Sequence, residues 1–342
     1  MSSNILIPMP FTPFVLKAMA ELGRNVLSGT SASCNVTSIA NKEWLMVLAL
    51  FPKPTATNTP TMRFNNDSAT NYSDRYSKDG AAETTDVTQS GIIMWPTLAT
   101  TMNEVFFIGF IHNIAGQEKT LQGWAVERNS ANGTSAPHRH EVVGKWANTS
   151  NAITEVDVVA STSTFAIGTR VIVLGYDNAD IVAIPFWQET GRSTLGGTST
   201  NIQTTLSTTA DFVWVDAYLL ATGALQPELR LNNDSGANTY CDRGSISGGG
   251  DTTHTGATFG TICESLSVPQ YVIGFIGSIS TEFKLGIFFS IGQNTAGAGN
   301  APSRCQNVVK YTGNASKITE VDFVPSTSSF AAGTEVVVYS GS

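Results

Sequence analysis

Short apolar runs separated by polar turns recur along the whole chain. The runs are bounded by Asn, Asp, Gly and Ser, a pattern typical of strands buried in a β-sandwich. Residues 153–159 alternate between apolar and polar side chains, as in a strand with one face in water. The clearest apolar runs are 44–50, 105–111, 170–174, 212–215, 271–276 and 335–339.

The spacing of these runs predicts the fold class. About eight strands in roughly 150 residues favour a sandwich of two antiparallel sheets, of the jelly-roll type. Two segments near the N-terminus depart from this pattern. Residues 15–22 are expected to form a short helix, and residues 1–12, which are apolar and proline-containing, form an N-terminal arm.

The strongest feature of the sequence is an internal repeat. Residues 62–68 (MRFNNDS) return as residues 229–235 (LRLNNDS), and Tyr72-Ser73-Asp74-Arg75 returns as Tyr240-Cys241-Asp242-Arg243. Further matches keep nearly the same offset: 108–111 with 273–276, 153–157 with 318–322, and 165–169 with 330–334. Self-similarity over this distance indicates two copies of one domain.

The repeat sets the expected domain boundaries. We expect an arm over 1–12, a first β-sandwich over 13–178 and a second β-sandwich over 179–342. The arm has no counterpart in the second copy.

Composition and charge exclude some functions. Only 13% of the residues are charged and the formal net charge is −8. A nucleic-acid partner requires a basic face for the phosphates, so we expect none. The longest apolar stretch, 44–51, is far too short to span a bilayer, and the N-terminus lacks the pattern of a secretory signal. We therefore expect no membrane span and synthesis in a cytoplasm.

The cysteines do not follow the repeat. Cys34 lies in the first copy, and Cys241, Cys263 and Cys305 lie in the second. An architectural disulfide would recur in both copies. A Cys241–Cys263 or Cys263–Cys305 bridge remains open, because sequence alone does not fix connectivity. No pair of cysteines has the spacing of a zinc site.

The best-preserved loop carries candidate metal ligands. Asp67 and Asn71, with Asp234 and Asn238 in the second copy, offer oxygen atoms of the kind that Ca²⁺ prefers. The same residues fit a hairpin turn in which Asp and Asn side chains bind their own backbone, which we favour. No other cofactor is expected.

Other polar positions allow two interpretations each. Arg75 and Arg243 fit a ligand site or a structural pair with the preceding Asp. His138 and His140 share a strand face, as metal ligands do, but the second copy lacks them. The pairs Glu155/Asp157 and Glu320/Asp322 could suggest a glycosidase pair, but we interpret them as the wet face of a strand. No nucleophile elbow, P-loop or dinucleotide fingerprint is present, and we expect no enzyme.

Several aromatic residues are candidates for sugar stacking. Trp124 and Trp146, with Tyr176 and Trp187, have the flat faces that bind a saccharide. Core packing is the commoner role for Trp, and we favour it.

The repeated residues also carry a resemblance to a known family. Residues 63–72 (RFNNDSATNY) and 165–175 are repeated at 230–240 and 330–341. They resemble a β-sandwich module of the virion proteins of tailed phages and related viruses, which often contains R-F-N-G-D-x-G-x-N-Y and ends in F-x-x-G-S-x-x-x-L-Y-G. Asn66 and Asn233 stand where Gly is common. The resemblance implies a virion structural role without catalytic residues.

These expectations lead to three hypotheses. The first is a virion structural protein, a capsid decoration or capsid/tail surface component, made in the host cytoplasm. It would associate with itself and with other virion proteins through the sandwich flanks and the apolar arm residues Ile5, Ile7, Pro8, Met9 and Phe11. The second is a carbohydrate- or receptor-binding protein of a virion tip or fibre, with a host surface glycan as its partner. The third is an extracellular filament or surface-layer subunit.

Overall fold

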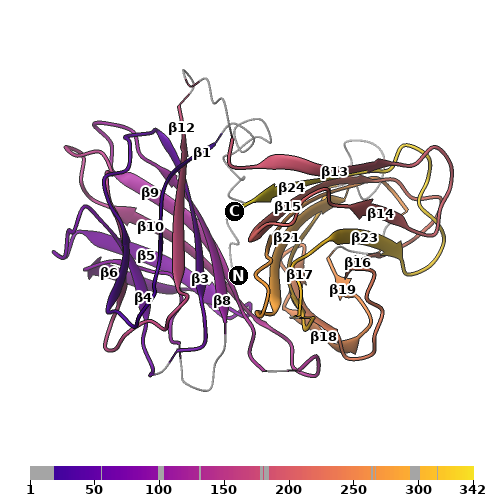
Figure 1. The fold of residues 1–342 in the computed structure, drawn as a ribbon, viewed down its shortest axis with the longest axis horizontal. Helices are drawn as coiled ribbons and strands as arrows, with labels where there is room; N and C mark the ends of the chain where they lie inside the picture. The colour runs from indigo at the N-terminus through magenta and orange to yellow at the C-terminus, as the bar shows by residue number, and fades with distance from the viewer. Residues whose placement is uncertain are drawn as a thin grey trace. The chain divides into compact units, whose positions relative to one another are not determined.

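The chain is built from β-strands. The computed structural model describes residues 19–342 except 55, 99–103, 131, 178–179, 181–184, 263–264, 266, 293–300 and 314. The described residues form strands β1 to β24 and no α-helix (Figure 1). This confirms the all-β class and the tandem β-sandwich architecture.

The chain divides into two compact units. Unit 1 comprises Met1–Glu127 with His140–Phe186, and unit 2 comprises Arg128–Arg139 with Trp187–Ser342. Within unit 2 the segment Arg128–Arg139 is bound to the body of the unit. The buried ammonium of Lys310 donates to the carbonyls of Arg128 (2.9 Å) and Ser135 (2.8 Å).

Unit 1 is a sandwich of a large and a small sheet. The large sheet has the order β1-β12-β3-β8-β9-β10-β5-β6, and the small sheet has the order β2-β11-β4-β7. Its strands are β1 (Ala20–Val26), β2 (Ser33–Val36), β3 (Trp44–Phe51), β4 (Pro60–Phe64), β5 (Tyr72–Lys78), β6 (Thr84–Gln89), β7 (Ile92–Ile93), β8 (Val105–His112), β9 (Lys119–Glu127), β10 (His138–Trp146, of which the first two residues belong to unit 2), β11 (Val156–Ala160) and β12 (Arg170–Tyr176).

Eight of these strands follow a nested, jelly-roll-like order. The first strand pairs with the last (β1 with β12), β2 with β11, β3 with β8 and β4 with β7, all antiparallel. Strands β5–β6 and β9–β10 are two inserted pairs that extend the large sheet beyond β8. The sequence indicated about eight strands per copy, whereas each unit has twelve in the described part of the chain. Strands such as the polar β6 (TTDVTQ) and the two-residue β7 are too polar or too short to show an apolar run.

Unit 2 repeats this order strand for strand. Its large sheet is β13-β24-β15-β20-β21-β22-β17-β18 and its small sheet is β14-β23-β16-β19. The strands are β13 (Gln188–Thr194), β14 (Ile202–Thr205), β15 (Phe212–Leu219), β16 (Pro227–Leu231), β17 (Tyr240–Ile246), β18 (Thr252–Ala257), β19 (Gly260–Thr261), β20 (Gln270–Gly277), β21 (Lys284–Gly292), β22 (Ser303–Tyr311), β23 (Glu320–Pro325) and β24 (Glu335–Gly341). Each strand therefore has its counterpart twelve strands later.

The core of each unit lies between its two sheets. In unit 1, buried side chains of the large sheet, such as Val47 and Phe107, cluster with Phe64 and Val156 of the small sheet. In unit 2, Val215 and Phe288 cluster in the same way with Leu229 and Phe323. Removing these apolar surfaces from water is the main stabilising contribution, at about 25 cal/mol per Å².

The repeated Ile-Gly-Phe-Ile motif has a packing reason. A Cβ added at Gly274 would lie 2.2 Å from the ring of Phe288, a fully buried core residue directly opposite it on β21. In unit 1 a Cβ at Gly109 would lie 2.8 Å from the ring of Phe107. The glycine leaves room for an aromatic ring to lie across the strand.

The helix expected over residues 15–22 is wrong where it can be compared. Residues 15–18 lie outside the described residues, and Ala20 to Leu22 begin strand β1, with Ala20 opposite Gly175 of β12. Leu22 packs against the core of unit 1. The strand ladder and this burial outweigh a weak local helix preference.

Candidate functional site

The Asn-Asn pair of the repeated loop forms a tight turn. Asn65 and Asn66 have φ of 55° and 57°, and Asn232 and Asn233 have φ of 57° and 53°. Asn is among the few residues that tolerate this left-handed conformation. The Asn65 side-chain oxygen accepts the backbone N–H of Thr154 at 2.8 Å, and Asn232 does the same with Thr319 at 2.7 Å. The pair therefore ties the turn to the segment that precedes β11 or β23.

The carboxylate of Asp67 is held by three donors. It accepts the backbone N–H of Ala69 (2.9 Å), the side-chain amide of Asn71 (2.8 Å) and the indole N–H of Trp146 (2.7 Å). Partial burial works to raise the pKa of Asp67, but the bonds from Asn71 and Trp146 outweigh it and lower the pKa. The candidate Ca²⁺ ligands of unit 1 therefore bind each other in a closed turn.

Unit 2 builds the same turn with different residues. Asp234 accepts the N–H of Gly236 (2.8 Å) and the hydroxyl of Tyr311 (3.0 Å), which replaces Trp146. Asn238 has a φ of 62°. Across the described part of the chain, no group of three or more His, Cys, Asp and Glu side chains is placed to hold a metal ion. A calcium site at this loop stays a prediction.

The repeated Asp-Arg dipeptide joins the two sheets through its aspartate. Asp74 on β5 accepts the backbone N–H of Ile93 on β7 (2.9 Å), and Asp242 on β17 accepts that of Thr261 on β19 (2.9 Å). Burial raises the pKa of Asp74 to about 6. Asp242 is also bound by Nδ1 of His254 at 2.8 Å.

The arginines of this dipeptide have other partners. Arg75 is exposed and forms an ion pair with Glu83 (3.0 Å), while the Nε of Arg243 donates to the carbonyl of Pro137 (2.8 Å). Neither interaction identifies a ligand. A role of Arg75 and Arg243 in ligand binding stays a prediction.

The candidate stacking residues are packed inside the protein. Trp146 is 1% exposed and stacks on Tyr72, with 6.3 Å between ring centroids. Trp124 is also buried and meets Phe110 edge-on at 6.1 Å. A sugar stacks on the exposed face of an aromatic ring. Both tryptophan rings are buried, so in this structure they pack in the protein interior. The arm residues Ile5 to Phe11 lie outside the described residues.

The histidine pair and the cysteines are mostly buried. His140 lies between Tyr76 (5.4 Å) and Trp95 (5.6 Å), and burial lowers its pKa to about 3, so it is neutral near pH 7. Cys241 is a free thiol that donates to the carbonyl of Ser135 at 3.0 Å, which argues against a Cys241–Cys263 bridge. Cys263 itself lies outside the described residues.

The paired acidic residues lie on the outer face of the small sheets. In unit 2, Asp322 on β23 is directly opposite Gln203 on β14 and Arg230 on β16. The neighbours Val321 and Phe323 belong to the core, so this row points away from it. Asp322 and Arg230 line a hollow of about 500 Å³. Burial and the neighbouring Glu320 raise the pKa of Asp322.

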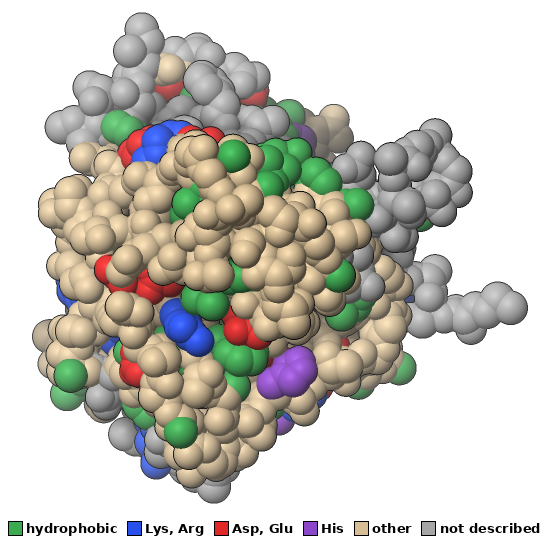
Figure 2. Space-filling model, turned by 90° about the vertical axis from the view of Figure 1, so that its right-hand side faces the viewer, with side chains coloured by type: hydrophobic (Ala, Val, Ile, Leu, Met, Phe, Trp, Pro, Cys, Tyr) green, Lys and Arg blue, Asp and Glu red, His purple; other side chains and the backbone are tan. Residues whose placement is uncertain are grey.

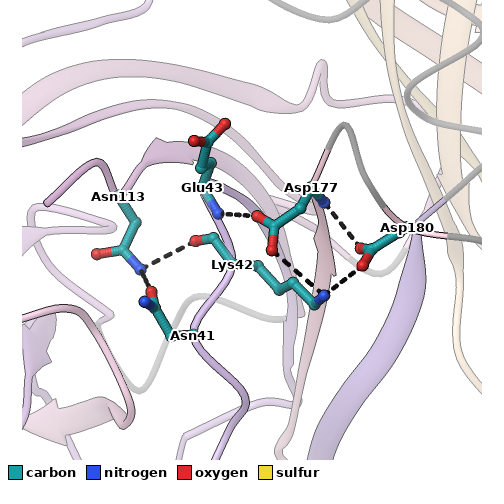
Figure 3. Close-up of polar contacts among 6 residues, drawn as sticks. All are labelled: Asn41, Lys42, Glu43, Asn113, Asp177 and Asp180. Carbon is teal, nitrogen blue, oxygen red and sulfur yellow. Dashed lines mark hydrogen bonds and ion pairs between the residues drawn. The ribbon is translucent and has the colours of Figure 1, made fainter.

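A charged network at the end of unit 1 was not predicted from the sequence. The Lys42 ammonium lies between the carboxylates of Asp177 (3.3 Å) and Asp180 (2.5 Å), which follow strand β12 (Figure 3). Asp177 also accepts the N–H of Glu43 at 2.6 Å. The two aspartates raise the pKa of Lys42, and the hydrogen bond that Lys42 donates to Asp180 is the largest cause. The only sequence signal is the Asp-x-x-Asp spacing after the strand, which is too common to identify it.

Comparisons with known proteins assign no family. No protein-family model matches the chain, and no curated protein matches it. Among solved structures, laminin α1 domains LG4–5 from mouse align over 100% of this chain and 94% of theirs, at 9% identity and a TM-score of 0.18. The outer membrane protein OprG of Pseudomonas aeruginosa aligns over 88% of this chain and 99% of its own, at 8% identity and a TM-score of 0.10. Likeness this low carries no argument about fold or function. Within the described ranges, no helix is long and apolar enough to cross a membrane.

Proposed function

We propose that this chain is a non-enzymatic structural protein of a virion, a capsid decoration or capsid/tail surface component. The observation that carries the proposal is the duplication of a complete jelly-roll-like sandwich, with the same strand order in both units. Viral capsid proteins use jelly rolls, as do lectins and cupins. Because fold analogy alone leaves these classes open, the resemblance of residues 63–72 and 165–175 to virion modules favours the first class.

The repeated polar residues support a structural role. Asn65 and Asp67 hold the turn between β4 and β5, and Asp74 joins the large sheet to the small sheet. Unit 2 makes equivalent contacts through Asn232 and Asp234. Side chains shared by both copies are therefore used to hold the sandwich, as expected of a building block.

Two similar units on one chain are suited to assembly. A duplicated domain presents two similar surfaces on each chain. A ring of three chains, for example, would present six similar surfaces. Other virion proteins and further copies of this chain are the proposed partners. The apolar arm over residues 1–12 is the proposed connector.

Light scattering of the full-length protein and of a variant lacking residues 1–12 tests this proposal. We expect closed oligomers for the full-length chain and monomers for the truncated chain. Electron microscopy of the same samples separates closed particles from open filaments, which would favour an extracellular filament subunit. Monomers in both samples would contradict assembly through the arm.

A further inference from the structure

Inside unit 2, the outer face of the large sheet at β17 and β22 holds the segment Arg128–Arg139. The buried ammonium of Lys310 on β22 donates to carbonyls of this segment, among them that of Ser135 at 2.8 Å. The Nε of Arg243 on β17 donates to the carbonyl of Pro137 at 2.8 Å. Both cations bind backbone oxygens, so this part of the contact depends on the course of the segment and not on its side chains.

A buried ion pair completes the contact. The guanidinium of Arg139 lies 2.5 Å from the carboxylate of Asp251, which immediately precedes β18, and both side chains are more than nine-tenths buried. Two charges that are buried together need each other, because removal of one leaves the other uncompensated. We call the surface formed by Lys310, Arg243 and Asp251 the segment-binding face of unit 2.

Unit 1 has the same face at the same strand positions. The charges are kept in the three counterparts, which are Lys145 for Lys310, Arg75 for Arg243 and Glu83 for Asp251. In unit 1, however, these side chains are 47%, 50% and 38% exposed, respectively. Lys145 pairs with Glu118 at 2.8 Å, and Arg75 pairs with Glu83 at 3.0 Å. Exposed ion pairs contribute little to stability, so they can be exchanged for other partners at small cost.

The chain also contains a second copy of the segment. Residues 293–304 (QNTAGAGNAPSR) repeat residues 128–139 (RNSANGTSAPHR), and the two connections from β9 to β10 and from β21 to β22 have the same length. Residues 293–300 lie outside the described residues, but Pro302 is exposed whereas its counterpart Pro137 is buried. One chain therefore offers a second segment and a second face of the same kind.

We propose that the outer face of β5, β6 and β10 in unit 1 binds residues 293–304 of a second copy of this chain, as unit 2 binds Arg128–Arg139. Arg304 of the second copy, the counterpart of Arg139, then pairs with Glu83, and Lys145 donates to backbone carbonyls of the segment. This inference rests on the proposed assembly and adds a contact that does not use the N-terminal arm.

The charges make this face specific. Only 13% of the residues are charged, and Figure 2 shows a face of the molecule on which charged side chains are few and separated by uncharged surface. A Lys, an Arg and an acidic residue at matched positions are therefore a particular feature of the two segment-binding faces. The open face belongs to unit 1 and the second segment to unit 2, so each contact leaves one of each available. Such head-to-tail contacts build a closed ring or an open filament.

Charge reversal across the contact tests the proposal, by sedimentation equilibrium on the full-length chain. Glu83→Arg and Arg304→Glu each bring like charges together, so each should raise the concentration at which half of the chains are assembled by at least about tenfold. An equal mixture of the two variants should assemble like the parent, because contacts between unlike copies pair opposite charges again. Glu189→Arg is the matched control and should assemble like the parent, since Glu189 is similarly exposed and also pairs with an arginine.

Three results would overturn the proposal. The first is a parent chain that stays monomeric at every concentration. The second is that Glu83→Arg and Arg304→Glu assemble like Glu189→Arg; if removal of residues 1–12 still abolishes assembly, the proposed function stands without this contact. The third is that the mixture assembles no better than either variant alone, with thermal melts showing both folded. If a charge reversal prevents folding, Lys145→Ala decides in its place, and its assembly should also be at least about tenfold weaker.

Discussion

Removal of one buried hydroxyl tests how the repeated tyrosine holds each sandwich. The hydroxyl of Tyr240 accepts the backbone N–H of Leu231 at 2.8 Å and donates to the Leu231 carbonyl at 3.2 Å. Tyr72 makes the same two contacts with Phe64, at 2.9 and 3.4 Å. Tyr240 is fully buried and stacks on Tyr311, with 4.9 Å between centroids. Tyr240→Phe therefore keeps the ring and leaves a buried backbone N–H without a partner.

The expected cost follows from that lost partner. An unsatisfied buried donor destabilises a protein by about 1–3 kcal/mol. For a domain of this size, 1 kcal/mol lowers the melting temperature by about 2–4 °C. Tyr240→Phe should therefore lower the melting temperature of unit 2 by about 2–12 °C.

Differential scanning calorimetry measures this shift, and Tyr218→Phe is the control because the Tyr218 side chain is 46% exposed. The control should melt within about 1 °C of the parent, since surface changes have small effects. If Tyr240→Phe melts no lower than Tyr218→Phe, the hydroxyl does not hold the start of β17 and the reasoning is refuted.

Three further predictions concern other positions. Asp242 raises the pKa of His254 through their hydrogen bond, so the stabilisation from this pair is full below about pH 6.5 and is lost as the pH rises through the folded pKa. His254→Gln should therefore reduce the change in melting temperature between pH 6 and pH 9. A pH profile of melting temperature that equals that of the parent would contradict this. Gly274→Ala should lower the unfolding free energy of unit 2, measured in urea, by more than about 1 kcal/mol, because the added Cβ would overlap the ring of Phe288. An unchanged unfolding free energy would show that the ring can move aside. Arg75→Ala should change the unfolding free energy by less than about 0.5 kcal/mol, because its ion pair is exposed; a larger loss would indicate a role beyond the surface pair.

Much of the fold was accessible from the order of residues. The offset repeat and the apolar runs predicted two all-β sandwiches, and the structure confirms that class. The polar strand β6 was missed, because its alternation carries no apolar signal. The helix over 15–22 was wrong at Ala20 to Leu22, because pairing with β12 decides the conformation there.

The candidate sites were accessible only in part. The repeat identified Asp67 and Asp234 as important, but their partners Trp146 and Tyr311 lie 79 and 77 residues away in sequence. The pair of Glu320 and Asp322 was noted as a strand face. That Asp322 is buried and lies beside Arg230 became visible only when β23 and β16 were placed side by side.

The sequence by itself determined the all-β class, the duplication and the turn residues, because these depend on local periodicity and on the conformations that Asn and Gly tolerate. The tertiary structure alone decided the strand order, the inserted pairs of the large sheet and the burial of each polar group. Those properties depend on which distant strands pair, and a carboxylate such as Asp322 is exposed or enclosed according to the loops that close over it.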